Sequence, residues 1–265
     1  MRTHLYTVCW NEAEMLGFFF RHYDPWVDRY IVFDDGSTDG SLEILRSNPK
    51  VDVRPLVRSN ADSFVLSHLR LMNEAWKESR GNADWVIVVD VDELLQARGW
   101  NNSDYVTACA RQGITWIPAV GYQMTGEEFP RPDEHLATTH TMGAPSVWMS
   151  KLSLFNPNAI VETSFTVGRH EAQPTGDLRL PANDELLLLH YKYLGLEYSS
   201  ERLRALAARR GEFDRRNGWG RHYYWDRAEL EAELKGMRAR SVDVHCKPDE
   251  LATPAKRWWR SSPAA

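Results

Sequence analysis

The sequence has few of the features that mark membrane, disulfide-rich or nucleic-acid-binding proteins. Only three of its 265 residues are cysteine, and Cys9, Cys109 and Cys246 match neither a zinc spacing nor a disulfide framework. No run of eighteen apolar residues occurs, so we expect no membrane-spanning helix. Met1 leads directly into a strand-like run without the apolar core of a signal peptide. These absences predict a cytoplasmic protein.

The charge is small overall but unevenly distributed. The formal net charge of −5 argues against a nucleic-acid partner. Residues 1–200 carry 17 Lys and Arg against 27 Asp and Glu, whereas residues 201–265 carry 15 against 10. This pattern predicts an acidic body that handles a cation and a basic C-terminal segment that contacts something anionic.

The first hundred residues alternate strand and helix patterns. We expect helices at 11–22, 41–47 and 63–79 and strands at 5–10, 30–33, 51–54 and 85–89. The last of these strands, Trp85 to Val89, is apolar on both faces, which is typical of a parallel sheet covered by helices. The order predicts an α/β fold with a doubly wound, mostly parallel central sheet and helices on both faces.

The second half is less regular. We expect strands at 114–120, 151–155, 164–168 and 185–191, helices at 198–210 and 226–240, and a long functional loop at 123–145. The predicted organisation is a main domain at 1–197, with a regular half at 1–95 and a less regular half at 96–197. A basic, aromatic-rich helical extension follows at 198–265.

Polar side chains follow three of the predicted strands, at the sheet edge where ligands bind in open parallel sheets. Asn11 and Glu12 follow the first strand, and Asp34 and Asp35 follow the second. The fourth strand ends in Asp90-Val91-Asp92, whose two carboxylates face one point because alternate residues of a strand point the same way. Mg²⁺ or Mn²⁺ would relieve their repulsion, although the same pattern suits a solvated strand end that caps a helix.

Three segments together carry a resemblance to a known family. They are the strand followed by Asn11-Glu12, the run YIVFDDGSTDGS at 30–41, and the run DWVIVVDVDE at 84–93. In this order the chain resembles the GT-A nucleotide-sugar glycosyltransferases, in their family 2-like branch. The match is good over residues 3–95, loose over 96–180, and returns at His190-Tyr191. It implies a catalytic domain at 1–197, with a nucleotide-binding half at 1–95 and an acceptor-side half at 96–197.

The resemblance implies a role for each matching residue. Trp10, Asn11 and Glu12 would flank the nucleotide base, and Asp35, with Asp34 beside it, would accept a hydrogen bond from the base or ribose. Arg70 would lie near the diphosphate and Asp90 near the ribose or sugar. Asp92 and His190 would bind the metal, Mn²⁺ or Mg²⁺, and a neutral imidazole suits Mn²⁺ better. A strand-end histidine bonded to backbone is the alternative for His190.

The implied reaction moves a sugar from a nucleoside diphosphate sugar, most simply a UDP-sugar, to a hydroxyl acceptor, with inversion. The acceptor hydroxyl must lose a proton, so a carboxylate base is expected. Glu171 ranks first because it follows a predicted strand and precedes a Pro/Gly turn, and Asp133 is the next candidate. The remaining candidates for the base are Glu134, Asp184 and Glu185.

Other functions share parts of the pattern. In a haloacid-dehalogenase-like phosphatase Asp90 would be the nucleophile, but that family has Thr or Val where this chain has Leu94. Sugar-nucleotide pyrophosphorylases need a Gly-rich loop after the first strand, and residues 9–12 contain no glycine. A non-catalytic nucleotide-sugar-binding module would be expected to lack one or more of Asp35, Asp92 and His190, and all three are present.

The basic C-terminal segment allows two interpretations. Its aromatic residues, with Lys256, Arg257 and Arg260, suit peripheral contact with the inner face of a membrane and with a glycan or lipid-linked acceptor, as in cell-surface polysaccharide synthesis. The alternative is a helical layer that packs its aromatic rings on the catalytic domain. The aromatic residues concerned are Trp219, Tyr223, Tyr224, Trp225, Trp258 and Trp259.

Overall fold

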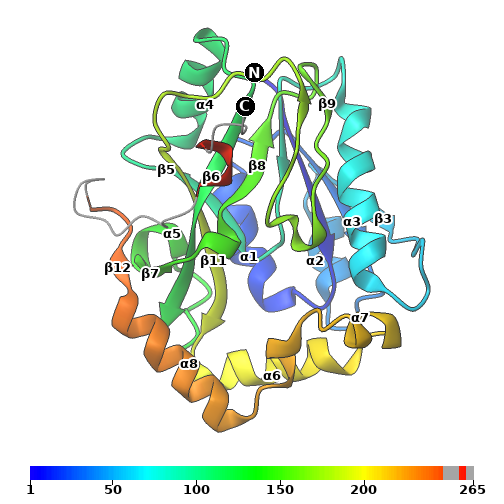
Figure 1. The fold of residues 1–265 in the computed structure, drawn as a ribbon, viewed down its shortest axis with the longest axis vertical. Helices are drawn as coiled ribbons and strands as arrows, with labels where there is room; N and C mark the ends of the chain where they lie inside the picture. Colours follow the sequence, from blue (N-terminus) through cyan, green and yellow to red (C-terminus); the bar gives the residue numbers. More distant parts are fainter. Residues whose placement is uncertain (247–256, 261–265) are drawn as a thin grey trace.

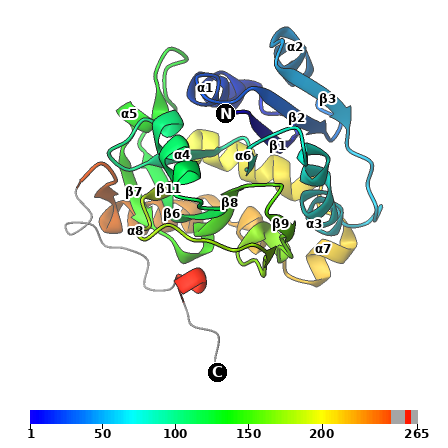
Figure 2. The same ribbon diagram turned by 90° about the horizontal axis from the view of Figure 1, so that it is seen from above.

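A computed structural model describes residues 1–246 and 257–260, which form one layered α/β unit (Figures 1 and 2). The strands are β1 Thr3–Cys9, β2 Arg29–Asp34, β3 Val51–Pro55, β4 Trp85–Val88, β5 Glu93–Ala97, β6 Trp116–Gly126, β7 Met142–Pro145, β8 Lys151–Phe155, β9 Ile160–Glu162, β10 Thr175–Gly176, β11 Leu186–Leu194 and β12 Val242–Asp243. The α-helices are α1 Ala13–Tyr23, α2 Ser41–Ser47, α3 Phe64–Glu74, α4 Asn102–Arg111, α5 Leu136–Thr139, α6 Leu196–Ala208, α7 Glu212–Arg216 and α8 Arg227–Arg240. Short 3₁₀ turns include η3 Val167–Arg169 and η4 Arg221–Tyr224.

The N-terminal half of the sheet is parallel, in the order β3-β2-β1-β4. Helices α1 and α2 lie on one face and α3 lies on the other (Figure 2). This arrangement follows from right-handed crossovers, because the chain moves outward from β1 to β3 and then returns to β4 on the other side of β1. The fold class expected from the sequence is confirmed.

The second half adds antiparallel strands through the long strand β6. Strand β8 runs antiparallel to both β4 and β6. Beyond this pairing, β6 continues beside β11, which is parallel to it, and β11 in turn pairs with β5. The predicted loop at 123–145 is therefore wrong in part, because residues 123–126 extend β6 and residues 142–145 form β7.

The strand predicted at 164–168 is also wrong. This segment makes a single antiparallel bridge between Phe165 and Ala172, and then turns through η3. The turn is fixed by Arg169, which has a left-handed backbone angle of φ +58° and a side chain that is 1% exposed. The burial of this side chain takes precedence over the strand pattern of its neighbours.

One apolar core joins the two halves, since its buried members run from Leu5 on β1 to Trp259 near the end of the described chain. A smaller cluster lies beneath the C-terminal helices and includes Tyr193, Leu203 and Leu230. Helices α6, α7 and α8 form a layer across the end of the sheet to which β1 and β11 point (Figure 1). No helix within the described residues is long and apolar enough to cross a membrane.

The end of the described chain packs onto the fold. Trp259 is 7% exposed and donates from its indole nitrogen to Asp184, and Arg257 and Arg260 form ion pairs with the same carboxylate. These side chains therefore follow the packing interpretation, and Lys256 lies outside the described residues. Membrane contact of the remaining C-terminal segment stays a prediction.

The close approach of β6 to the turn before β8 leads to a stability prediction. A Cβ on Gly121 would lie 2.1 Å from the carbonyl carbon of Met149, whereas a Cβ on Gly17, in helix α1, would meet nothing within 4 Å. We expect Gly121→Ala to lower the free energy of unfolding by about 2 kcal/mol or more. Gly17→Ala should leave it unchanged or raise it by up to about 1 kcal/mol. Urea unfolding of both variants measures the difference, and equal effects would contradict the packing described.

Candidate active site at the carboxyl edge of the sheet

Strands β1, β2 and β4 are parallel and end at one edge of the sheet, and Trp10–Glu12, Asp34–Asp35 and Asp90–Asp92 lie at or directly after their ends. Arg202 on α6 donates to the backbone carbonyls of Trp10 and Asn11, directly after β1. The C-terminal helical layer therefore forms one wall of this edge.

A buried carboxylate shapes the turn that carries Asp90 and Asp92. The side chain of Glu93 is 0% exposed and lies 2.6 Å from Lys151 Nζ and 2.6 Å from an Arg169 guanidinium nitrogen. The same carboxylate accepts the backbone N–H of Asp90 at 3.0 Å. Because an unpaired buried charge is costly, these contacts fix β5, β8 and η3 relative to one another.

Asp90 lies beside side chains from two elements. Its carboxylate lies 3.4 Å from Arg169 and 3.4 Å from His68, which is on helix α3. Burial alone would raise the pKa of Asp90, but Arg169 and His68 outweigh it and hold the pKa well below its usual range. Asp90 is therefore a carboxylate at neutral pH, and its side chain is 39% exposed.

The pairing of β11 with β5 and β6 brings Asp92 and His190 together. His190 is opposite Glu93 in one ladder and opposite Gln123 in the other. Its Nε2 lies 3.2 Å from Asp92 Oδ2, and its Nδ1 lies 2.6 Å from Gln123 Oε1. Burial opposes the ionised form of Asp92, but His190 outweighs it and lowers the pKa of that carboxyl.

These two side chains fit a divalent cation. When His190 donates its Nδ1 proton to Gln123, the Nε2 lone pair faces the Asp92 carboxylate, and two facing acceptors require a cation or a proton between them. Holding the non-ligating nitrogen by a hydrogen bond is also how proteins orient metal-binding histidines. Within residues 1–246 and 257–260, no group of three metal-binding side chains is brought together.

Two of the predicted nucleotide-site residues support the loop after β2. Asp34 accepts the backbone N–H groups of Gly36 and Ser37 at 3.0 and 3.1 Å. Asn11 accepts that of Thr38 at 2.7 Å. Their polar groups hold the loop in place, as is common for Asp and Asn in turns.

Glu12 pairs with Arg202, and its side chain is 12% exposed. Burial raises the pKa of Glu12 to about 8, although the guanidinium of Arg202 pulls in the opposite direction. The ion pair thus links the residue after β1 to helix α6.

Asp35 is held by two arginines. Arg58 donates to both carboxylate oxygens, at 2.7 and 3.2 Å, and Arg209, at the end of α6, pairs with one of them. The guanidinium of Arg209 also lies over two aromatic rings, 3.7 Å from the ring centre of Trp10 and 5.5 Å from that of Phe64. Trp10, Phe64 and Asp35 therefore surround one planar cation.

The other predicted residues lie farther from these contacts. Arg70 is on the exposed side of α3. The residue of this helix that contacts Asp90 is His68. Glu171 is exposed and follows Arg169 by two residues, which keeps it within about 7 Å along the chain. The side chain of Asp133 is 83% exposed in the loop after β6.

The remaining candidates for the base have other partners. Glu134 accepts a hydrogen bond from Arg131 and lies 2.5 Å from His140. Asp184 is buried and forms ion pairs with Arg257 and Arg260. The backbone carbonyl of Glu185 accepts the N–H of Arg98.

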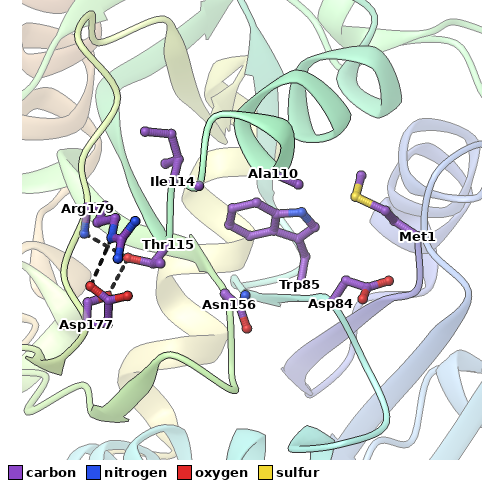
Figure 3. Close-up of a pocket in the computed structure, with 10 residues that line it drawn as sticks. Met1, Asp84, Trp85, Ala110, Ile114, Thr115, Asn156, Asp177 and Arg179 are labelled. Carbon is purple, nitrogen blue, oxygen red and sulfur yellow. Dashed lines mark hydrogen bonds and ion pairs between the residues drawn. The ribbon is translucent and has the colours of Figure 1, made fainter.

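Two hollows lie elsewhere on the surface. One, of about 290 Å³, is at the end of the sheet where β4 begins, and is lined by Met1, Trp85 and the Asp177–Arg179 ion pair (Figure 3). This hollow lies at the opposite end of the sheet from Asp90 and Asp92, which follow β4. The second, of about 420 Å³, is in the C-terminal layer, where its lining includes Trp219, Tyr224 and Trp225 with Arg215 and Arg221.

Several residues of the site were not predicted from the sequence. Arg202 and Arg209 are seven positions apart, and two helical turns place them on one face of α6, so their spacing was a readable signal. Lys151, Arg169 and Gln123 carry no such signal, because strand pairing brings Lys151 and Gln123 to the site and the turn η3 brings Arg169.

No protein-family model matches the chain, and no curated protein matches it. Solved structures similar to it include glucosyl-3-phosphoglycerate synthase from Mycobacterium tuberculosis with phosphoglyceric acid (18% identity, 59% of this chain, 57% of that chain, TM-score 0.34). The same synthase with Mn²⁺, UDP and glucosyl-3-phosphoglycerate matches at 18% identity over 45% of this chain and 44% of that chain, with a TM-score of 0.29. A third is 4-diphosphocytidyl-2C-methyl-D-erythritol synthase from Anaerococcus prevotii DSM 20548 (10% identity, 59% of this chain, 70% of that chain, TM-score 0.32).

The chain thus spans about half the length of the synthase structures that it matches, and these TM-scores carry no argument about fold or function. The architecture is instead defined by the chain's own sheet order, β3-β2-β1-β4-β8-β6, with Asp90 and Asp92 following β4. This order is that of the GT-A fold, as the sequence resemblance implied.

The buried Glu93 leads to a second prediction. We expect Glu93→Gln to lower the free energy of unfolding by about 3 kcal/mol or more, because it leaves the buried Lys151 and Arg169 without their carboxylate. Glu74→Gln is the matched control, since its side chain is 60% exposed and pairs with Lys77 on the surface. That variant should change stability by less than about 0.5 kcal/mol. Similar losses in both variants would show that Glu93 does not hold the site together.

Proposed function

We propose that this protein is a metal-dependent glycosyltransferase that moves a sugar from a nucleoside diphosphate sugar to a hydroxyl acceptor. The observation that carries the proposal is the facing pair of Asp92 and His190, with His190 oriented by Gln123. A divalent cation held by Asp92 and His190 would stabilise the negative charge that develops on the diphosphate leaving group.

The donor nucleotide would bind beside β1 and β2. Trp10 and Phe64 offer ring faces for a base, and the Asp35 carboxylate offers acceptors for its edge. A carboxylate favours a base that presents a ring N–H, as uracil and guanine do. It disfavours cytosine and adenine, which present a ring nitrogen lone pair. These contacts support a UDP-sugar or a GDP-sugar, and the sequence resemblance favours UDP.

Asp90 would contact the ribose or the sugar. Arg169 and His68 keep it ionised, so that it can accept hydrogen bonds from hydroxyl groups. Its contacts with the same two side chains limit its use as a nucleophile, which weakens the phosphatase alternative.

The acceptor would lose its proton to a carboxylate as it attacks, with inversion at the anomeric carbon. Glu171 remains the first candidate, because it is two residues from the arginine that holds Asp90. The outer part of a glycan acceptor would rest in the hollow lined by Trp219, Tyr224 and Trp225, since aromatic faces beside arginines suit sugar rings that carry negative charge.

The metal assignment can be tested directly. Asp92→Asn and His190→Ala should lower Mn²⁺-dependent release of UDP from UDP-sugars by about 100-fold or more, because each removes a ligand. Calorimetry should show weaker Mn²⁺ binding in both variants. Asp104→Asn, an exposed change on α4, is the control and should behave as the wild type. Full turnover in EDTA, or an active Asp92→Asn variant, would contradict the assignment.

The choice of catalytic base needs two variants. Glu171→Gln should lower kcat for transfer by about 10²–10⁴-fold, the usual contribution of a general base, with unchanged UDP and Mn²⁺ affinity. Asp133→Asn should leave kcat unchanged. The reverse outcome would assign the base to Asp133, and full activity in both variants would place it elsewhere.

A further inference from the structure

The contacts of Arg209 resemble those expected of a bound nucleobase. Its planar guanidinium lies over the rings of Trp10 and Phe64 and donates to Asp35. A uracil or guanine ring in the donor site would use the same three groups, stacking on the aromatic side chains and giving an N–H to the carboxylate. Arginine is the side chain best able to imitate this, because it is flat and carries several N–H donors.

Arg209 is not required to neutralise the charge of the Asp35 carboxylate. Arg58 already makes a two-point contact with that carboxylate, at 2.7 and 3.2 Å. Burial, together with the neighbouring Arg58 and Arg202, lowers the pKa of Arg209 although Asp35 raises it, so the guanidinium is in a place that disfavours its charge. Two arginines on one carboxylate also repel each other.

We propose that Arg209 is an internal ligand of the donor site, and that the nucleobase enters by displacing its guanidinium from Trp10, Phe64 and Asp35. This inference rests on the proposed function, because it assumes a nucleotide donor. The proposal adds Phe64 to the residues that bind the nucleobase. It also means that Arg209, at the end of helix α6, competes with the donor for this site.

The displacement would be transmitted to the rest of α6. Arg202, two turns earlier on the same face, pairs with Glu12 and donates to the carbonyls of Trp10 and Asn11. The two arginines together hold α6 against the edge of the sheet. Releasing one of them leaves the helix attached at only one of these two points, so donor binding should loosen its C-terminal end.

The test compares UDP binding, with Mn²⁺, in the wild type, Arg209→Ala and Arg204→Ala. Arg204 is an exposed residue of the same helix, so the control has the same charge change. If Arg209 occupies the site about nine-tenths of the time, its removal should tighten UDP binding by about tenfold in calorimetry. The control should match the wild type. Unchanged or weaker binding in Arg209→Ala would overturn the proposal, since Arg209 would then be neutral or would bind the donor.

Hydrogen exchange gives an independent readout. Adding UDP to the wild type should speed exchange in residues 196–210, and the Arg209→Ala variant should exchange faster there before UDP is added. Slower exchange on adding UDP would overturn the proposal, because it would mean that Arg209 closes on the nucleotide. If neither the wild type nor Arg209→Ala bound UDP or GDP, the proposed function would be wrong as well. Failure of the Arg209 proposal alone would leave nucleotide binding intact, so the two outcomes can be distinguished.

The second wall of the base site is tested in the Arg209→Ala background, so that loss of the arginine contact does not confuse the result. There, Phe64→Ala should weaken UDP binding by about tenfold, within the range of base-to-aromatic stacking. Unchanged affinity would exclude Phe64 from the base site and overturn that part of the proposal. Thermal unfolding of each variant shows whether the fold is retained.

Discussion

The site depends on the buried carboxylate of Glu93. This one side chain pairs with Lys151 from β8 and Arg169 from η3, and accepts the backbone N–H of Asp90. A charge this deeply buried is stable only with all of its partners in place, so it couples three segments that are distant in the sequence. The positions of Asp90 and Asp92 at the end of the parallel half follow from that coupling.

A second set of charges connects the helical layer to the sheet. The carboxyl edge is acidic, and helix α6 presents Arg202 and Arg209 to it. The acidic body and basic C-terminal segment of the sequence are therefore partners within one molecule as well as candidates for binding other groups. At an ordinary surface such pairs contribute little, but here they are largely removed from water and adjoin the proposed donor site.

Much of the fold was predictable because its signals are local. The apolar run at 85–89, the helical spacing in the first hundred residues and the turn at Asp34 to Ser37 each specify one element, and the structure has them. Residues 123–126, 142–145 and 164–168 were predicted incorrectly. In these segments, pairing with distant strands and the burial of Arg169 override the local pattern.

The sequence by itself determined which acidic groups follow the strands, because parallel strands end at a common edge. It also determined the order of elements that defines the fold class. Only the tertiary structure decided that His190 faces Asp92 with Gln123 behind it, since that contact arises from the register of β11 against β5 and β6. The tertiary structure also decided the contact of Arg209 with Trp10, since these residues are 199 positions apart. Their contact depends on where helix α6 packs, and that is set by the surfaces around the helix as well as by its own sequence.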